Sequence, residues 1–291
     1  MLFLLHGPDA TTFLQGQTTA DLTQLEIHGF AGGAFCDPKG RVLCDFLVLR
    51  IRQDAMLLRV HESVAGQLEA HLQKFLMFAK ATLERDQRRV SGLCEVALPE
   101  SLHASEHSHE STAIPFEEGY LLRREINFYE YWGHDPGVKQ LADSLTLSVS
   151  EDNYVWYLHS IQRGEARITR ATWGKYLPQD LNYDLCGWVS FKKGCYTGQE
   201  VIARLHWRGS PKRRLYCGCI NTTVNADTSG LISEGSQITD KNGKSCGSVV
   251  NVVRLDSTHC IAFEATTAAD GGELLIDNFG AVVSAITPFA S

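Results

Sequence analysis

The sequence has no apolar run long enough to span a membrane and no paired Cys-x-x-Cys motif of the kind that builds standard zinc sites. Its nine cysteines are odd in number and scattered, which argues against a disulfide framework and predicts reduced thiols. A net charge of −7 disfavours nonspecific nucleic-acid binding by the whole surface, but is compatible with a local basic patch. The apolar start, Met1-Leu2-Phe3-Leu4-Leu5, lacks a basic leader and is too short for a signal-peptide core, so we expect a cytoplasmic protein.

The chain of 291 residues, with 44% hydrophobic and 21% charged residues, predicts an ordinary globular protein of two or three domains. We expect a helix from Asp9 to about residue 25, because Asp is a favourable N-cap. Strands over residues 29–59 should form a hairpin around Asp37-Pro38-Lys39-Gly40. Apolar residues at spacings of three and four predict a helix over residues 62–83.

The second half of the chain changes from helical to strand patterns. Residues 152–168 have helical character, and short alternating segments follow Gly209-Ser210-Pro211. Asp240-Lys241-Asn242-Gly243 is typical of a hairpin turn, because Asn-Gly suits the positive φ angles that match strand twist. We therefore predict a small C-terminal β-barrel from strands at residues 215–220, 231–238, 248–254, 259–265 and 274–276.

One octet, Lys193-Gly194-Cys195-Tyr196-Thr197-Gly198-Gln199-Glu200, carries the most functional information. Its glycines indicate a tight loop running into a helix, which would place Cys195 near a helix N-terminus. The helix dipole and the Lys193 cation both favour a thiolate, the form that attacks electrophiles or binds metals. The alternative is a buried structural cysteine, since free cysteines are among the most buried residues.

The octet resembles the signature of the YgfZ-type folate-binding proteins, relatives of the glycine-cleavage T-protein. The resemblance extends to Phe13-Leu14-Gln15-Gly16-Gln17-Thr18-Thr19-Ala20-Asp21 and to Cys36-Asp37-Pro38-Lys39-Gly40-Arg41. It continues through residues 161–168 and Leu177-Pro178-Gln179-Asp180-Leu181-Asn182-Tyr183-Asp184, in the family's order and spacing. It covers most of the chain, and for Cys195 it favours a functional role over a structural one.

The resemblance implies an α+β fold with three lobes around a central folate-binding opening. Two lobes would be ferredoxin-like and the third would be the β-barrel. Transferred to this chain, residues 1–25 with 114–208 form a discontinuous first lobe, residues 26–113 form an inserted lobe, and residues 209–291 form the barrel.

The T-protein branch has an Asp-Asp pair, one member of which lies at the folate and is required for aminomethyl transfer. The matching positions here are Cys44-Asp45. Adjacent strand residues point to opposite faces, so only one of the two can face the opening. Asp45 is thus either a proton-handling group or a solvated strand residue, and both interpretations stay open.

The candidate catalytic residues are Cys195 and Lys193, and no metal ligand set is predicted. For Glu200 we favour a structural role in the first helical turn. The resemblance implies tetrahydrofolate or a folate derivative as cofactor. The candidate cofactor-binding residues are Asp45, Arg163, Glu165, Asp180, Asn182, Tyr183, Tyr196, Gly198, Gln199 and Glu200.

Three other patterns are weaker. A basic segment runs from Arg204 to Arg214 around Trp207, and it either contacts RNA or covers a lobe-to-barrel junction with its arginines paired to acids, the option we favour. Cys217 and Cys219 share one face of a strand, which favours buried barrel packing. His103, His107 and His109 have a spacing compatible with a metal, although solvated loop histidines are commoner.

The leading functional interpretation is a folate-binding accessory protein that supports maturation or repair of iron-sulfur enzymes and thereby tRNA modification. Its partners would be folate, iron-sulfur client or assembly proteins and, with weaker support, tRNA, but no membrane. The first alternative is a tetrahydrofolate-dependent aminomethyl or methyl transferase. The second is an RNA-binding module that acts through the basic segment.

Overall fold

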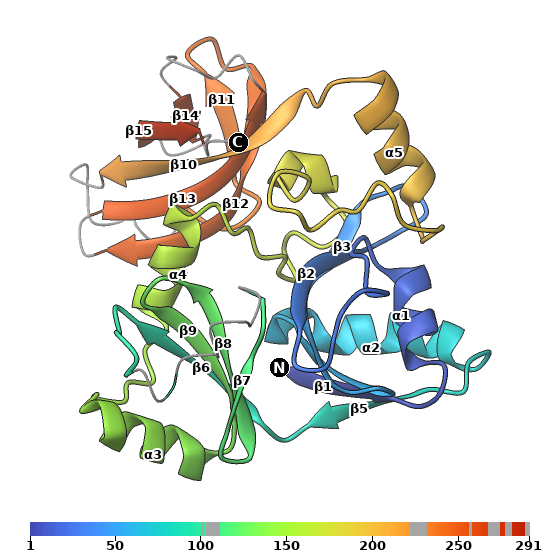
Figure 1. Ribbon diagram of the computed structural model, residues 1–291. Helices are drawn as coiled ribbons and strands as arrows, with labels where there is room; N and C mark the ends of the chain where they lie inside the picture. The colour runs from blue at the N-terminus through green and yellow to red at the C-terminus, as the bar shows by residue number, and fades with distance from the viewer. Residues whose placement is uncertain are drawn as a thin grey trace. The chain divides into compact units, whose positions relative to one another are not determined.

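A computed structural model describes residues 1–99, 102, 111–221, 232–255, 258–266, 274–276 and 281–288 (Figure 1). The chain divides into two compact units. The first comprises Met1–Phe35, Asp45–Trp156 and Lys192–Tyr196, and the second comprises Cys36–Cys44, Tyr157–Phe191 and Thr197–Ser291. The predicted α+β class is confirmed, since helices accompany three separate sheets.

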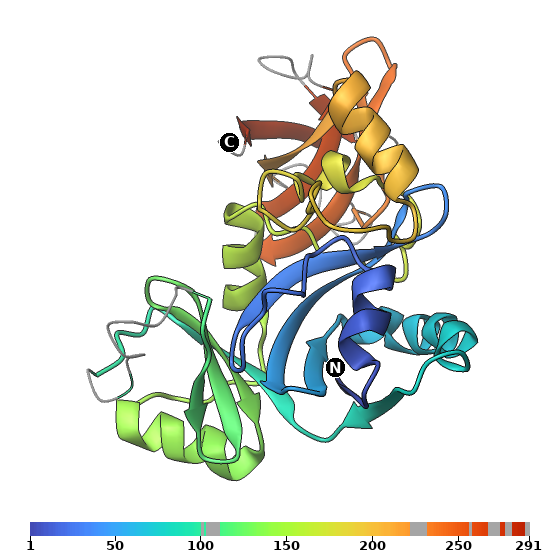
Figure 2. The same cartoon turned by 45° about the vertical axis from the view of Figure 1, so that its right-hand side comes forward.

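The first unit is built around a five-stranded sheet with strand order β2-β3-β4-β1-β5. Almost every residue of β3 is buried, as its Val- and Leu-rich sequence predicts. Helices α1 and α2 accompany this sheet (Figure 2). The elements are β1 (Leu2–His6), α1 (Ala10–Gln17), β2 (Phe30–Cys36), β3 (Val42–Arg52), β4 (Ala55–Arg59), α2 (Glu62–Leu76) and β5 (Thr82–Asp86).

Helix α2 confirms the predicted apolar face, because Val64, Leu68 and Leu72 are all buried. The predicted end of the helix is wrong, however. The helix ends at Leu76, and Leu83 lies in β5, where it pairs with Leu5 of β1. Pairing with a neighbouring strand satisfies the backbone of this segment in an extended form, which overrides the helical spacing.

A second, antiparallel sheet completes the first unit, with strand order β6-β9-β8-β7. Glu130 of β9 is 1% exposed and lies 3.2 Å from Arg59 of β4, so this buried ion pair joins the two sheets. The elements are β6 (Arg89–Cys94), β7 (Ile114–Phe116), β8 (Gly119–Glu125), β9 (Phe128–Gly133) and α3 (Asp135–Leu145). Helix α4 (Tyr154–Gln162) follows and ends before Gly164, whose φ of 76° is unfavourable for a side-chain-bearing residue, so the helix predicted to residue 168 is shorter.

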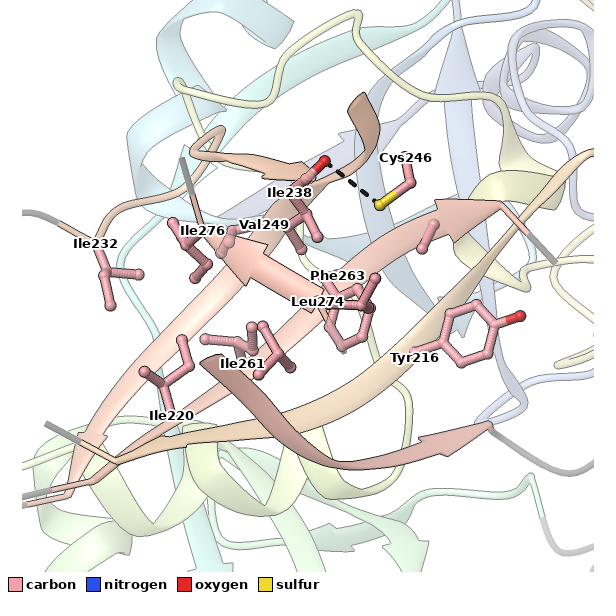
Figure 3. Packing of buried hydrophobic residues seen from close by; sticks show 12 residues of the cluster. Tyr216, Ile220, Ile232, Ile238, Cys246, Val249, Ile261, Phe263, Leu274 and Ile276 are labelled. Atoms are coloured by element: carbon pink, nitrogen blue, oxygen red, sulfur yellow. Dashed lines mark hydrogen bonds between the residues drawn. The ribbon is translucent and has the colours of Figure 1, made fainter. Parts of the chain in front are cut away.

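The second unit contains a closed barrel with strand order β10-β13-β12-β11-β14-β15. Its core is apolar and includes Ile220, Ile261 and Phe263 (Figure 3). The predicted turn at Asn242-Gly243 is confirmed: Gly243 has a φ of 76°, and the Asp240 side chain accepts the amides of Asn242 and Lys244. The strands are β10 (Arg213–Asn221), β11 (Gln237–Asp240), β12 (Ser245–Leu255), β13 (Thr258–Thr266), β14 (Leu274–Ile276) and β15 (Ala281–Pro288).

The lobe boundaries inferred from the resemblance stay a prediction. Strand β1 pairs with β4 and β5, so the first residues of the chain share a sheet with the segment assigned to the inserted lobe. No helix among the described residues combines the length and apolar character that crossing a membrane requires.

Candidate functional site

The octet forms a loop over residues 193–198 that leads into helix α5 (Gln199–Arg208). Gly198 is the N-cap of α5 and has a φ of 85°. A Cβ atom at this position would lie 2.6 Å from the carbonyl oxygen of Asp37, so only glycine allows the loop to approach the hairpin turn this closely. Gly194 has no positive φ, and a Cβ atom there would meet nothing within 4 Å, so of these two glycines only Gly198 uses the backbone freedom of glycine.

Cys195 is exposed and its thiol is free. It precedes α5 by four residues in the sequence, close to the predicted position before a helix. A cysteine sealed in the hydrocarbon core would have excluded a reactive role, and this sulfur is accessible instead.

Lys193 is only 8% exposed, and its ammonium group is saturated with hydrogen bonds. The Nζ atom donates to the carbonyl oxygens of Gln15 at 2.8 Å, Thr18 at 2.7 Å and Ala20 at 2.6 Å, where α1 ends. Burial lowers the pKa of Lys193 to about 8, and the nearby Asp21 opposes this shift. A cation at a helix C-terminus interacts favourably with the helix dipole, so Lys193 anchors the loop that carries Cys195.

Tyr196 packs beside this anchor. It is 7% exposed, and its ring centroid lies 5.0 Å from the Lys193 Nζ, within cation–π range. Lys193 and Tyr196 therefore face the protein interior, whereas Cys195 between them faces solvent.

Three of the family-like segments converge within the second unit. In the hairpin turn, the amide of Gly40 donates to the Asp37 carbonyl oxygen at 2.9 Å, and Gly198 packs against this turn. Arg41 donates to the Lys175 carbonyl oxygen at 2.8 Å and lies 3.8 Å from the Asp180 carboxylate. The 3-10 helix η2 (Pro178–Leu181) is joined to α5 by Gln179, whose amide nitrogen donates to the Ile202 carbonyl oxygen at 2.9 Å.

Several candidate folate-binding side chains have structural partners. Arg163 and Glu165 lie 3.5 Å apart as an ion pair. Asn182, with a φ of 59°, exchanges side-chain hydrogen bonds with the backbone of Leu215 and so joins η2 to β10. The Tyr183 hydroxyl donates to the Ala166 carbonyl oxygen at 2.9 Å.

The other candidates divide by burial. Asp45 is 3% exposed, so the interpretation of a solvated strand residue is wrong, and Cys44 beside it is also buried. Gln199 is half-buried and Glu200 is exposed in the first turn of α5, as expected for a carboxylate near a helix N-terminus. His103, His107 and His109 lie outside the described residues.

Part of the basic segment is neutralised by acids, as expected. Arg214 makes a two-pronged ion pair with Asp184, with nitrogen–oxygen distances of 2.7 and 3.1 Å. Arg213 donates to Glu264 of β13 at 2.8 Å. Among the described residues, Arg204, Arg208 and Lys212 form no ion pair.

The acid that accepts a hydrogen bond from Arg213 was not identified from the sequence. Glu264 is 1% exposed, and its Oε1 accepts hydrogen bonds from Arg213 and, at 3.1 Å, from the Ser248 hydroxyl. Burial raises the pKa of Glu264 to about 7, while Arg213 opposes the shift. Burial also raises the pKa of Asp180, opposed by its hydrogen bond from the Leu177 amide. A single Glu between apolar strand residues gives no sequence signal that its side chain will be buried and hydrogen-bonded to Arg213.

Two buried oxygens in this region, Gln179 Oε1 and Glu264 Oε2, have no hydrogen-bond partner among the described residues. A buried acceptor without a donor is costly, and a ligand with N–H groups would satisfy it. The pterin ring of a folate carries such N–H groups, so this part of the second unit is chemically compatible with the implied cofactor.

Comparison with known structures defines the fold class first. The chain is similar in structure to the glycine cleavage system aminomethyltransferase T from Bartonella henselae, with a TM-score of 0.69 and 16% sequence identity over 99% of this chain and 83% of that one. The shared fold is therefore that of the glycine-cleavage T-protein.

Sequence comparison then defines the family. The "tRNA-modifying protein YgfZ" of Serratia proteamaculans is 31% identical over 231 residues, which cover 74% of this chain and 67% of that protein. The Colwellia psychrerythraea protein of the same name is 28% identical over 92% of this chain and 82% of its own length. The match to the Vibrio vulnificus relative spans 66% of that protein. No family model matches the sequence. The chain belongs to the YgfZ family.

The anchoring role of Lys193 predicts a loss of stability on substitution. Lys193→Met removes the donor to three carbonyl oxygens, those of Thr18 and Ala20 in buried hydrogen bonds, which should lower the free energy of unfolding by about 3 kcal/mol. Urea denaturation measures this. Lys192→Met removes the same charge from an exposed neighbour and is the control. Equal stability of the two variants would refute the anchor.

The raised pKa of Glu264 predicts a pH dependence of stability. Between the unfolded pKa of about 4.5 and the folded pKa of about 7, the folded chain binds more protons, so this group's contribution to stability falls as pH rises. In Glu264→Gln this dependence is absent. The difference in unfolding free energy between wild type and variant should therefore shift by about 2 kcal/mol against wild type from pH 5 to pH 7.5. A difference that is constant with pH would contradict the assignment.

Proposed function

We propose that this chain binds a folate and acts as an accessory factor in iron-sulfur enzyme maturation or repair, and thereby in tRNA modification, with Cys195 as its reactive thiol. The observation that carries the proposal is the exposed thiol on an anchored loop. Lys193 and Gly198 fix the two ends of this loop, while Cys195 stays accessible. Family membership supports the proposal, since similar proteins are named tRNA-modifying proteins.

The folate part of the proposal rests on the T-protein fold and on buried acceptors in the second unit. Asp180 carries a raised pKa because it is buried, and Gln179 Oε1 and Glu264 Oε2 are buried acceptors without donors among the described residues. These groups would hold N–H donors of a pterin. Arg163, although paired with Glu165, is a further candidate for the carboxylates of a folate.

A tetrahydrofolate-dependent transferase is the alternative within the same fold. Cys44-Asp45 stands where the T-protein branch has two aspartates, and the surviving carboxylate of Asp45 is buried. The two interpretations differ in turnover. Incubation with a folate one-carbon donor and an amine or lipoyl acceptor yields product only for the transferase.

If the chain is an accessory protein, folate binding should not require the Cys195 thiol, whereas activity in the cell should require it. Cys195→Ser should bind a reduced folate within about twofold of wild type in calorimetric titration, because serine preserves the loop. It should fail to restore iron-sulfur enzyme activity in a strain that lacks the protein. Cys186→Ser is the matched control, since Cys186 is the other exposed cysteine, and partial burial with the nearby Glu165 and Asp184 raises its pKa to about 11. Full activity of Cys195→Ser would overturn the proposed thiol role.

A second candidate function, RNA contact, is favoured by one face of α5. Arg204, Trp207 and Arg208 are exposed at spacings of three and four, so they share this face. Trp207 is 69% exposed and meets the ring of His206 edge-on, and His206 in turn stacks on Phe191 at 3.6 Å. Single-stranded RNA is typically bound by cationic side chains that contact its phosphates and by aromatic rings that stack on its bases, and this face offers both.

The RNA candidate predicts that Arg204→Glu with Arg208→Glu weakens tRNA binding about tenfold and reduces its salt dependence, as measured by fluorescence anisotropy. These positions are better test sites than Arg213 and Arg214, whose ion pairs support the fold. Lys74→Glu with Lys139→Glu makes the same charge change at exposed positions elsewhere and should have little effect. An equal loss in both double variants would indicate only a net-charge effect.

A further inference from the structure

Strand alternation places two cysteines of β10 on the outer face of the barrel. Tyr216 and Ile220 of β10 point into the apolar core (Figure 3). Successive side chains of a strand point to opposite faces, so Cys217 and Cys219 face away from that core. Both are half-buried, and the prediction that they pack inside the barrel is wrong.

A third cysteine comes from the neighbouring strand. In β13, Ile261 and Phe263 belong to the core, so Cys260 lies on the outer face as well (Figure 3). The register pairs Cys260 directly with Cys219. The Cys260 sulfur also lies 3.8 Å from the Cys217 sulfur, so one buried thiol meets two half-buried ones.

The three thiols are not equivalent. The hydrogen bond from the Cys260 thiol lowers the pKa of Cys217, which favours the Cys217 thiolate. The same interaction raises the pKa of Cys260, which is 3% exposed and stays a thiol. Burial raises the pKa of Cys219, with Cys260 adding to the shift. Cys217 is half-buried and lies 3.8 Å from the buried Cys260, so an oxidant reaches the Cys217 sulfur first and Cys260 is the thiol positioned to react with it next.

We propose that Cys217 and Cys260 form a peroxide-reactive dithiol that closes to a disulfide, with Cys217 as the attacking and Cys260 as the resolving residue. Among the described residues, no cluster of three or more His, Cys, Asp or Glu side chains is arranged to hold a metal ion. The site lies on the barrel and does not depend on Cys195 or on folate.

The chemistry balances with hydrogen peroxide as the oxidant. The Cys217 thiolate attacks one peroxide oxygen, the O–O bond breaks, and the released hydroxide takes up a proton to become water. The sulfur of Cys260 then attacks the Cys217 sulfenic acid. A sulfur–sulfur bond forms, the S–O bond breaks, and the departing hydroxide takes the proton of Cys260 to give a second water. The two sulfurs together lose two electrons, which the peroxide gains.

The geometry permits closure with a local change. The sulfurs must approach by about 2 Å, from 3.8 Å to a disulfide bond length of about 2.05 Å. The register pairs Cys217 with Ala262, so Cys217 and Cys260 are diagonal neighbours, and closure requires a local shift of the backbone as well as rotation of both side chains. Such a bond would be reversible by thiol reductants, as strained disulfides are.

Mass spectrometry of the full chain tests the proposal. After brief treatment with stoichiometric hydrogen peroxide, a non-reducing tryptic digest of Cys219→Ser should contain linked peptides that hold Cys217 and Cys260, and dithiothreitol should separate them. In Cys260→Ser, the Cys217 sulfenic acid has no resolving partner, so its labelling by dimedone should rise at least about fivefold over wild type.

Matched variants show which thiols react. Cys217→Ser should abolish the linked peptides, whereas Cys246→Ser, which changes a barrel-core thiol bonded to the Ile238 carbonyl oxygen, should leave them unchanged (Figure 3). Circular dichroism and thermal melting confirm that each variant is folded. The proposal is overturned if folded wild-type protein yields only a Cys219–Cys260 bond, or if Cys217 labelling does not change in Cys260→Ser.

Discussion

The loop that carries Cys195 depends on one buried cation. An ammonium group inside a protein is tolerated only where acceptors replace its water, and the Lys193 Nζ finds three carbonyl oxygens at the end of α1, where intrahelical donors run out. The other end of the octet is held by close packing of Gly198 against the turn at Asp37, at a distance that excludes a Cβ atom. Each end of the octet therefore has its own contact, and Cys195 is exposed.

Because successive side chains of a strand point to opposite faces, the barrel has apolar side chains on its inner face and titratable side chains on its outer face. Its inner face is apolar, whereas its outer face carries Glu264, Cys217 and Cys260. Burial raises the pKa of Glu264, whereas the contact between Cys217 and Cys260 is the larger cause of the pKa shifts of these two thiols. The outer face therefore carries an acid whose pKa is raised to about 7 and two thiols whose pKa values shift in opposite directions.

Much of the local structure was predictable. The apolar spacing of α2, the turns at Asp37 and Asn242, and the closed C-terminal barrel follow from patterns within a few residues of each other. Helix ends were predicted less well. Leu83 continues the helical spacing, but its backbone pairs with β1, and Gly164 ends α4 because its φ is positive.

The loop that carries Cys195 could be predicted from the sequence alone, because its glycines, lysine and cysteine stand together in one octet. The role of each residue, in contrast, depends on segments that are distant in the chain. Lys193 finds its partners more than 170 residues away, and Cys217 meets Cys260 from another strand. Asp45, adjacent to Cys44, is buried and not solvated. Burial and long-range contacts set protonation and reactivity, and neither is encoded in local spacing.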